Sequence, residues 1–440
     1  MSSQYPPQMR VPPPGPRSRE LHARLAAVES PSVDARRRAR LRADGGDYVP
    51  IVYAEGEGVN VFDVDGNRYV DLVAGFGSLL LGHRPRRVAR AIGEQEDRLW
   101  LALGDVYASE PKLEACERLA QLYPRKGARV ILGSSGADAI TAAMKSAVLA
   151  TGRPGIVAFD GGYHGLSHGP LAACGLRETY RQPFAQQLNP RVTFAPYPHD
   201  GSSLDATMRI VKDTLAGGEV GAVLVEPVLG RGGCAVPPRE FLPALAAACA
   251  RAGALLVCDE IWTGLGRSGA WLASLDAGTV PDLVCLGKGL GSGFPISACI
   301  GSESAMAAWG VHGGATIHTA THFGAPVACT AAIATLNAVA EEGLVDRART
   351  VGASFLEQLR QRTTGRGVKD VRGRGLMVGV LLEGGAERAL EVTRTLLARG
   401  WIALTGGASG DVLTLTPPLD IDQSLLTGFA DALAEALVPT

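Results

Sequence analysis

Short, continuous apolar runs alternate with helical patterns from about residue 128 onward, and this alternation constrains the fold more than any other feature of the sequence. A strand that is covered on both faces is apolar throughout, whereas a strand with one solvated face alternates between apolar and polar residues. The pattern therefore predicts an α/β fold around a mostly parallel central sheet. The predicted strands are residues 129–132, 155–159, 222–225, 254–258 and 283–286, and a helix is predicted over 137–150.

The two ends of the chain differ from this middle part. Residues 1–17 contain six prolines and few core-forming side chains, which is typical of a disordered leader. Residues 18–85 are predicted to form an N-terminal arm and part of a smaller α+β domain, with a hairpin that turns at Asp65-Gly66. A large domain is predicted over 86–332. Residues 333–440 are predicted to return to the small domain, which is thus built from both chain ends.

Composition argues against several classes of function. The 440 residues carry a net charge of −1, so the chain has no general attraction to nucleic acid or to an anionic membrane. The N-terminus lacks an apolar signal segment, and no stretch is apolar enough for a membrane span. The eight cysteines are scattered without a Cys-x-x-Cys pair, which favours reduced core residues in a cytoplasmic protein over disulfides or a zinc site.

Lys288 is the strongest candidate for chemistry. It lies in the apolar, glycine-rich run Asp282–Phe294, whereas the other five lysines have polar or charged neighbours. Burial of an ammonium group is costly, and desolvation lowers the pKa of a lysine and makes its amine a usable nucleophile. The alternative is a solvated lysine at the end of a strand, and this segment alone does not separate the two interpretations.

Three further polar segments follow predicted strands. Asp259 ends one strand, Glu226 follows another, and Gly133–Ala137 leads from a third into a helix whose first N–H groups suit a phosphate. In a parallel sheet these carboxyl ends meet at one edge, where ligands bind. A lysine, an acid and a phosphate site together suit pyridoxal phosphate. Taken singly, the serines of the third segment could be a simple helix cap, and Asp259 a solvated strand end.

One motif suggests a different ligand. Gly264–Gly269 matches the G-x-G-x-x-G fingerprint of dinucleotide-binding proteins. The segment that follows is too short for a clear helix, and no strand ending in an acid stands at the expected spacing. A nucleotide-binding dehydrogenase is therefore the weaker hypothesis, and we expect these glycines to shape a loop.

Several spaced motifs point to one family. Asp259–Gly269, Pro281–Gly291 around Lys288, Phe159–Gly165, Glu226–Val228 and Thr321–Pro326 fall in the order and spacing of motifs in a known group of enzymes. From about residue 45 to 437 the chain resembles the class III, subgroup II aminotransferases. The resemblance implies an enzyme of fold type I that depends on pyridoxal phosphate.

The resemblance also implies a role for each matching residue. Lys288 would form the Schiff base with the cofactor and carry the proton, and Asp259 would pair with the pyridine nitrogen. Thr321 would reach the phosphate of a neighbouring subunit, which implies at least a homodimer. The remaining cofactor-binding set comprises two ring-stacking residues, three phosphate-binding residues and the histidine of the Tyr-His-Gly motif: Tyr163 and Ile261, then Ser135, Gly136 and Ala137, and finally His164.

Some positions depart from family members that act on 4-aminobutyrate or acetylornithine. Leu166 stands where an arginine often follows Tyr-His-Gly, and Leu229 stands where a glutamine is frequent, so a less polar amine donor is expected. Arg231 stands at an often acidic position and is a candidate contact for the carboxylate of a 2-oxo acid. It could equally be a surface arginine.

Three more residues are expected near the substrate. Trp262 replaces a frequent glutamine beside the cofactor, Phe76 is expected in the pocket wall, and Glu226 is expected on the substrate side of the ring. The sequence thus predicts an aminotransferase that moves an amino group from a primary amine or ω-amino acid to a 2-oxo acid by a ping-pong mechanism. An amino-acid racemase or aminomutase of the same fold stays open. A non-catalytic binding protein would have lost Lys288 or Asp259, and both are present.

Overall fold

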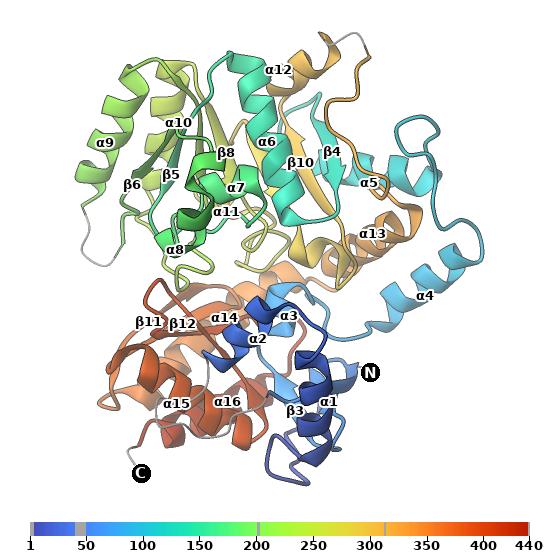
Figure 1. Ribbon diagram of the computed structural model, residues 1–440, viewed down its shortest axis with the longest axis vertical. Helices are drawn as coiled ribbons and strands as arrows, with labels where there is room; N and C mark the ends of the chain where they lie inside the picture. The colour runs from blue at the N-terminus through green and yellow to red at the C-terminus, as the bar shows by residue number, and fades with distance from the viewer. Residues whose placement is uncertain (1–3, 40–49, 200–202, 312–313, 439–440) are drawn as a thin grey trace.

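A seven-stranded sheet lies at the centre of the upper lobe of the molecule (Figure 1). The computed structural model describes residues 4–39, 50–199, 203–311 and 314–438. Six of the strands formed by these residues run in one direction, and β10 runs against its neighbours. The prediction of an α/β fold with a mostly parallel sheet is confirmed. In sheet order the strands are β4 Arg129–Gly133, β10 Ser297–Gly301, β9 Leu283–Leu286, β8 Leu255–Asp259, β7 Val220–Val225, β5 Gly155–Phe159 and β6 Val192–Ala195.

The sequence patterns located five of these strands and missed β6 and β10. β6 lies at the edge of the sheet and is only partly buried along most of its length, so it lacks a continuous core-forming run. β10 consists mostly of small residues, which carry a weak strand signal.

Helices cover both faces of this sheet. α6 (Gly136–Thr151) packs in one apolar cluster with Ile156, while α9 (Leu204–Ala216) and α10 (Phe241–Ala252) pack in another with Val157. Successive residues of a strand point to opposite faces, which is why the strands are apolar throughout. The other α-helices of residues 86–341 are α4 Arg86–Glu96, α5 Glu110–Gln121, α7 His168–Ala172, α8 Glu178–Arg181, α11 Ala273–Asp276, α12 Glu303–Met306 and α13 Pro326–Glu341, and the 3₁₀ helices are Gln182–Gln187, Lys288–Gly291 and Ala307–Val311.

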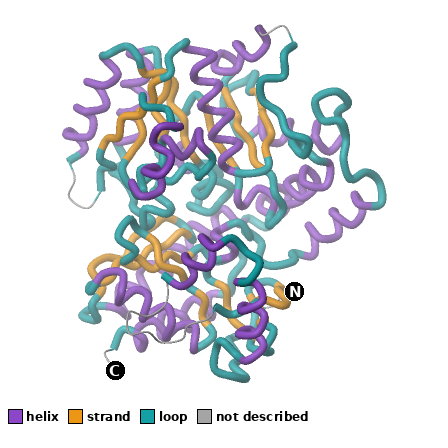
Figure 2. The backbone as a smooth tube through the Cα atoms, in the orientation of Figure 1, coloured by secondary structure: helices purple, strands orange, loops and turns teal. Residues whose placement is uncertain are grey.

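Two four-stranded sheets form the lower lobe, and both chain ends contribute to them (Figure 2). β13 of the C-terminal part pairs in parallel with β3 of the N-terminal part. The first sheet is β1 Tyr53–Glu57, β2 Asn60–Asp63, β3 Arg68–Asp71 and β13 Trp401–Ile402, and the second is β11 Val368–Arg374, β12 Met377–Leu382, β15 Val412–Leu415 and β14 Leu404–Gly406. The helices here are α3 Ala74–Gly77, α14 Leu344–Thr363, α15 Gly385–Ala398 and α16 Gln423–Ala436. The domain boundary predicted after residue 332 falls inside α13.

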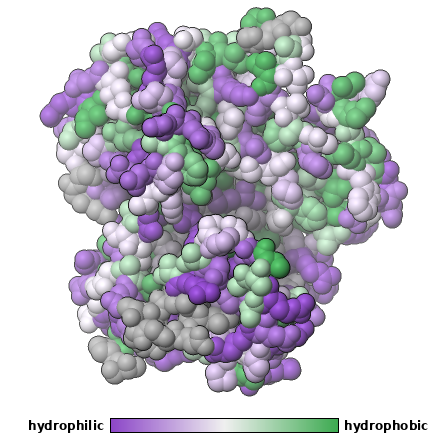
Figure 3. Space-filling model, in the orientation of Figure 1, coloured by the Kyte–Doolittle hydropathy of each residue, from purple (hydrophilic) through white to green (hydrophobic). Residues whose placement is uncertain are grey.

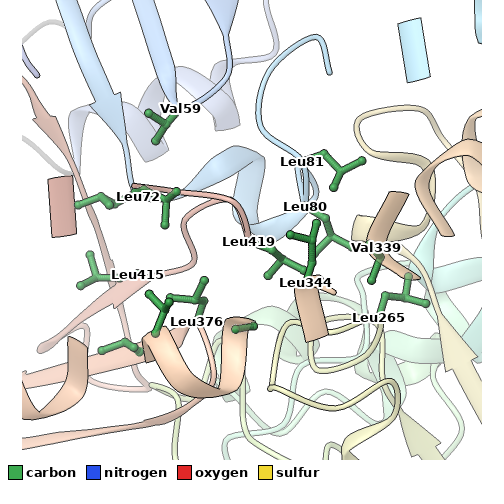
Figure 4. Close-up of a cluster of buried hydrophobic side chains, with 14 of the residues drawn as sticks. Val59, Leu72, Leu80, Leu81, Leu265, Val339, Leu344, Leu376, Leu415 and Leu419 are labelled. Atoms are coloured by element: carbon green, nitrogen blue, oxygen red, sulfur yellow. The ribbon is translucent and has the colours of Figure 1, made fainter. Parts of the chain in front are cut away.

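A large apolar cluster extends through both lobes. Leu72 and Leu415 of the small sheets belong to the same cluster as Leu265 of the large lobe and Val339 on α13, as Figure 4 shows. Leu265 lies within the Gly264–Gly269 motif, and a Cβ added at Gly266 would lie 3.2 Å from Leu419 of the small lobe. The glycines of this motif therefore shape a loop in the contact between the lobes. Among the described residues, no helix is long and apolar enough to cross a membrane.

The N-terminal leader, residues 4–39, lies against the small lobe and includes α1 (Pro16–Ala26) and α2 (Pro31–Arg38). Its backbone is held by polar side chains of the β2–β3 hairpin: Asn60 accepts a hydrogen bond from the N–H of Tyr5 at 2.9 Å, and Asn67 accepts one from Arg10 at 2.7 Å. This differs from the disorder that the proline content predicts for residues 4–17. Composition does not reveal it, because the partners lie more than 50 residues away in the chain. Residues 1–3 lie outside the described part.

Candidate active site

The predicted chemical residues come together at the carboxyl ends of the central strands. β7, β8 and β9 are neighbours in the sheet, and they are followed or ended by Glu226, Asp259 and Lys288 respectively. Asp259 pairs in register with Cys285, three residues before Lys288. The site lies between the two lobes, and Figure 3 shows the face on which the molecule is hollowed between them.

Lys288 presents an amine in an apolar setting. Its backbone is held at φ +40°, a left-handed conformation that few side chains adopt, and its Nζ lies 4.6 Å from the centroid of the Trp262 ring. Among the described residues no carboxylate lies within ion-pair distance of Nζ. Burial lowers the pKa of Lys288 below its ordinary value, and Arg231 lowers it further, while the charges of Asp259 and Glu226 oppose the shift. An amine in this state is more readily deprotonated and nucleophilic.

Asp259 is a buried and oriented carboxylate. One oxygen accepts a hydrogen bond from the N–H of Ile261 at 3.0 Å, and the other lies 2.7 Å from Nδ1 of His164. Only 3% of Asp259 is exposed, so its charge stays in a setting of low dielectric, where a protonated ring nitrogen is a strong partner.

The loop after β5 delivers His164 and Tyr163 to this edge. A Cβ added at Gly165 would lie 2.9 Å from that of Ala137, so the glycine allows the loop to pack directly on the start of α6. Glu226 accepts hydrogen bonds from the N–H groups of Tyr163 at 2.7 Å and Gly230 at 2.9 Å. Burial, together with the nearby charge of Asp259, raises the pKa of Glu226 to about 7.

The start of α6 has the form of a phosphate cradle. Ser135 caps the helix, and Asp138 accepts hydrogen bonds from the N–H groups of Ser134 and Ser135, so the predicted helix cap is present. The next two N–H groups, of Gly136 and Ala137, have no acceptor among the described residues. Because N–H groups in a first helical turn cannot bond within the helix, they remain available for an anion.

Ile261 lies directly beside this cradle. A Cβ added at Gly136 would lie 2.9 Å from Ile261 Cδ1, and one added at Gly287 would lie 3.4 Å from Ile261 Cγ2. The residues present therefore fit the cofactor that the family resemblance implies: an amine, a buried carboxylate, two open N–H groups and an apolar side chain share one edge of the sheet.

Three of the four residues expected near the substrate line a narrow pocket beside the lysine, and Glu226 is not among its lining residues. Phe76, Trp262 and Arg231 share its walls, and the guanidinium of Arg231 lies 4.9 Å from the centroid of the Tyr163 ring. Leu166 lines the adjoining outer pocket. Leu229 is only 1% exposed and packs in the core of the large lobe, so it is not a pocket wall, and the expectation of a less polar donor loses that support.

Thr321 does not join the other site residues within one chain. It is exposed and lines a separate surface pocket with His318 and Phe323. Its expected contact with the phosphate of a neighbouring subunit stays a prediction.

Sequence reasoning missed several residues that surround the substrate pocket. Arg36, Arg177, Thr405 and Thr414 line it or the pocket that adjoins it. Arg36 falls in the segment that the sequence predicts to be an N-terminal arm, and nothing in that segment indicates a site. No local signal distinguishes Thr405 or Thr414, because their position depends on how the small lobe folds back onto the large one.

Comparison with known proteins agrees with this geometry. The family model for class III aminotransferases matches residues 42–437. The chain is 38% identical over 390 residues to an acetylornithine aminotransferase of Methanopyrus kandleri (88% of this chain, 94% of that one). It is 34% identical over 419 residues to the 5-aminovalerate aminotransferase DavT of Pseudomonas aeruginosa (91% and 96%).

A solved structure is similar as well. An amine transaminase from an uncultivated Pseudomonas species, in a form with pyridoxal phosphate bound, has a TM-score of 0.81 at 29% identity and covers 90% of this chain and 97% of its own. The fold is thus that of the pyridoxal-phosphate transaminases. The chain belongs to the class III aminotransferases, and pyridoxal phosphate is its cofactor.

Proposed function

We propose that this enzyme transfers an amino group from a primary amine or ω-amino acid to a 2-oxo acid in two half-reactions of a ping-pong cycle. The observation that carries the proposal is the state of Lys288, a partly buried residue whose amine has a lowered pKa and no ion-pair partner among the described residues, near the charge of Asp259. The relatives named for acetylornithine and 5-aminovalerate support transfer from an amine that is remote from a carboxylate.

Each residue has a part in this scheme. Lys288 would hold the cofactor through Nζ and, once released, carry a proton to and from the substrate. Asp259, oriented by His164 at 2.7 Å, would keep a proton on the ring nitrogen. Ser135, with the N–H groups of Gly136 and Ala137, would hold the phosphate. When bound, the cofactor supplies an electron sink for the bond that breaks at the amine-bearing carbon.

The side chains around the ring would exclude water and orient the substrate. Ile261 would cover one face of the ring and Tyr163 the other, while Glu226 holds the backbone of Tyr163 in place. Trp262 and Phe76 would form the wall against which the donor packs.

The visible absorption spectrum of the purified holoenzyme tests this proposal. Amines and amino acids are added one at a time without any 2-oxo acid. Loss of the cofactor band with one donor, and its return with pyruvate or 2-oxoglutarate, is the result that we expect. A band that no donor changes, together with inversion of an amino acid seen by chiral analysis, would favour the racemase or aminomutase and overturn the proposal.

We also propose that the working unit is at least a homodimer, in which Thr321 reaches the phosphate of the neighbouring subunit. Thr321 is exposed, and its pocket includes the apolar side chains Leu101, Leu103 and Phe323, which suits coverage by a second copy. The unpaired state of the eight cysteines is consistent with the reducing cytoplasm that we propose as its location. A monomer by sedimentation at micromolar concentration would contradict the dimer.

A further inference from the structure

We infer that Arg267 is a positioning residue that, together with Thr416, holds the walls of the inner pocket against one another and so sets the width of that pocket. The inner pocket is the narrow one beside Lys288, with a cavity volume of about 30 Å³. The inference goes beyond the proposed function, because it concerns how the two lobes are joined at the cofactor site and not which donor reacts there. It also gives a part in the reaction to the arginine of the Gly264–Gly269 motif.

Arg267 is a fully buried cation at the junction of the lobes. Its side chain is 0% exposed, and among the described residues no carboxylate lies within ion-pair distance of its guanidinium. Its Nε and Nη2 have no hydrogen-bond partner in that part of the chain, and burial lowers the pKa of Arg267 to about 9. Since a buried charge without a counter-charge is costly, the hydrogen bonds that Arg267 does make indicate what it contributes.

Those hydrogen bonds run to two segments of the small lobe. Nη1 of Arg267 donates to the carbonyl of Leu376 at 3.0 Å, in the turn between β11 and β12, and to the carbonyl of Pro417, which follows β15. The backbone adds a bond from the N–H of Leu376 to the carbonyl of Arg267 at 3.0 Å. A Cβ added at Gly375 would lie 2.5 Å from that carbonyl oxygen, so the two backbones are in direct contact. Leu376 also packs in the apolar cluster that extends through both lobes (Figure 4).

Both sides of this contact lead to walls of the inner pocket. On the large lobe, Trp262 lines the pocket and precedes Arg267 in a loop that is closed by internal hydrogen bonds, such as the one from the hydroxyl of Ser268 to the carbonyl of Thr263 at 2.7 Å. On the small lobe, Thr414 lines the pocket from β15, directly before the segment to which Arg267 donates. Arg267 therefore fixes the separation of these two walls.

Thr416 holds a third wall of the same pocket. It is fully buried, its hydroxyl donates to the carbonyl of Val73 at 2.9 Å, and its N–H donates to the carbonyl of Leu72 at 2.7 Å. Val73 and Phe76 line the inner pocket from the N-terminal part of the small lobe. Arg267 and Thr416 thus join three distant segments by buried hydrogen bonds, which are costly to break. Lobes that are joined in this way do not hinge apart at the active site to admit a wide ligand.

Reaction of the holoenzyme with O-alkylhydroxylamines of different width tests the inference. These probes displace Lys288 from the cofactor, so the loss of the cofactor band gives a rate without turnover, whichever donor the enzyme uses. Methoxyamine is the narrow probe, O-benzylhydroxylamine is the wide one, and the reaction of each with free pyridoxal phosphate is the reference. Relative to this reference, we expect the wild-type enzyme to favour the narrow probe by roughly tenfold or more, as for fit in a rigid pocket.

Arg267→Met removes the donor and keeps much of the bulk, and it should lower this preference by roughly fivefold or more, since a wall that shifts by about 1 Å changes the fit strongly. Arg267→Lys should keep more of the preference, because an ammonium group can still donate to both carbonyls. Thr416→Val removes only the hydroxyl and should lower the preference by about twofold. This change is nearly isosteric, so it tests the inference even if Arg267→Met does not fold.

Arg349→Gln is the matched control. The Arg349 side chain also donates from the small lobe to this loop, to the carbonyl of Gly269 at 3.0 Å, but it is exposed and lines neither the inner nor the outer pocket. We expect this variant to keep the wild-type preference.

Thermal unfolding of each variant separates positioning from a purely structural role. A preference that stays at the wild-type value in Thr416→Val and in folded Arg267→Met, even with a lower midpoint of unfolding, would overturn the inference. An equal loss of preference in Arg349→Gln would overturn it as well, because the whole loop and not the buried contact would then set the fit. Since the probes react without transamination, failure of the proposed function leaves this test unchanged.

Discussion

The polar residues at the edge of the central sheet and those that contact the N-terminal leader differ in how fully their charges and hydrogen bonds are satisfied. At the sheet edge, burial lowers the pKa of Lys288 and raises that of Glu226 to about 7, and Trp262 Nε1 has no hydrogen-bond partner in the part of the chain that the structure describes. Where the leader meets the β2–β3 hairpin, Asn60 and Asn67 are buried and each both donates and accepts hydrogen bonds. In these two regions, the polar residues with unmet interactions lie where the cofactor is expected to bind, whereas the fully bonded ones hold the leader against the small lobe.

The largest expected effect is at Lys288. Replacement by alanine removes the only amine at the sheet edge among the described residues, so the holoenzyme band should vanish and turnover should fall by on the order of 10³-fold or more. Absorption spectroscopy and steady-state assay measure the two losses. A Lys288→Ala variant that kept both the band and the activity would show that the sheet edge is not the site.

Asp259 should come next. Asp259→Ala removes the carboxylate that lies 2.7 Å from His164, so the variant should still bind some cofactor but lose activity by roughly 100-fold or more, as for loss of a preorganised charge. Retained cofactor is measured from absorbance per chain. Buried Glu260 offers a matched control, because its carboxylate accepts hydrogen bonds from the N–H groups of Ala273 and Ser274 and so holds the loop that follows the strand. Glu260→Gln should therefore lower the stability of the fold more than it lowers the amount of bound cofactor. Wild-type turnover in Asp259→Ala would contradict the role.

Whether a region can be predicted from the sequence depends on how far apart along the chain its interacting residues lie. The sheet edge was predictable, because apolar runs mark strands covered on both faces and the residues after them must meet at one edge. The convergence of Lys288, Asp259 and the start of α6 at one edge was predicted in this way. Leu229 was misplaced, because the sequence does not show whether a loop residue points to the pocket or to the core.

The leader was not predictable from local pattern. Its proline content indicates disorder, but its backbone N–H groups find acceptors in a hairpin about 50 residues further along the chain. For the same reason, the sequence of neither segment indicates that Arg36 and Arg231 line the same pockets. Such contacts depend on the folded small lobe and not on composition.

Asp65 offers a way to separate the leader from the rest of the molecule. Its two carboxylate oxygens accept hydrogen bonds from the N–H groups of Arg17 at 2.8 Å and Ser18 at 2.9 Å, at the start of α1. Asp65→Ala should weaken attachment of the leader by about 1 kcal/mol, as for loss of a helix cap. Trypsin should then cut the arginine-rich leader faster.

The control for this change is Asp213→Ala, which removes an exposed carboxylate from α9. A pH series adds a second check. Partial burial raises the pKa of Asp65, but hydrogen bonds from Ser18 and Arg17 outweigh it, so the pKa lies below its ordinary value of 3.8. A lowered pKa means that the carboxylate stabilises attachment above pH 3.8, and this stabilisation is lost as the pH falls through the lowered value. Equal digestion of Asp65→Ala and wild type would show that Asp65 does not contribute to holding the leader.

The smallest expected effect has the opposite sign and bears on the sheet edge. If Lys288 is held there at a cost, replacing it with methionine should stabilise the apoenzyme at neutral pH, by roughly 0.5–1 kcal/mol, although it abolishes activity. The sign follows from the lowered pKa: between that value and the ordinary 10.5, the unfolded chain binds the proton and the folded chain does not.

Wild-type stability therefore rises with pH in this window, and the advantage of methionine should shrink as the pH approaches 10.5. The midpoint of thermal unfolding of the two apoenzymes, measured at a series of pH values from 7 to 10.5, tests both statements. Lys212→Met on α9, where the lysine is exposed, should show neither effect. A less stable Lys288→Met apoenzyme would mean that the favourable contact of the amine with the Trp262 ring outweighs the cost of its desolvation. Lys288 would then stabilise the fold, and the contrast between the sheet edge and the fully bonded leader would not hold for this residue.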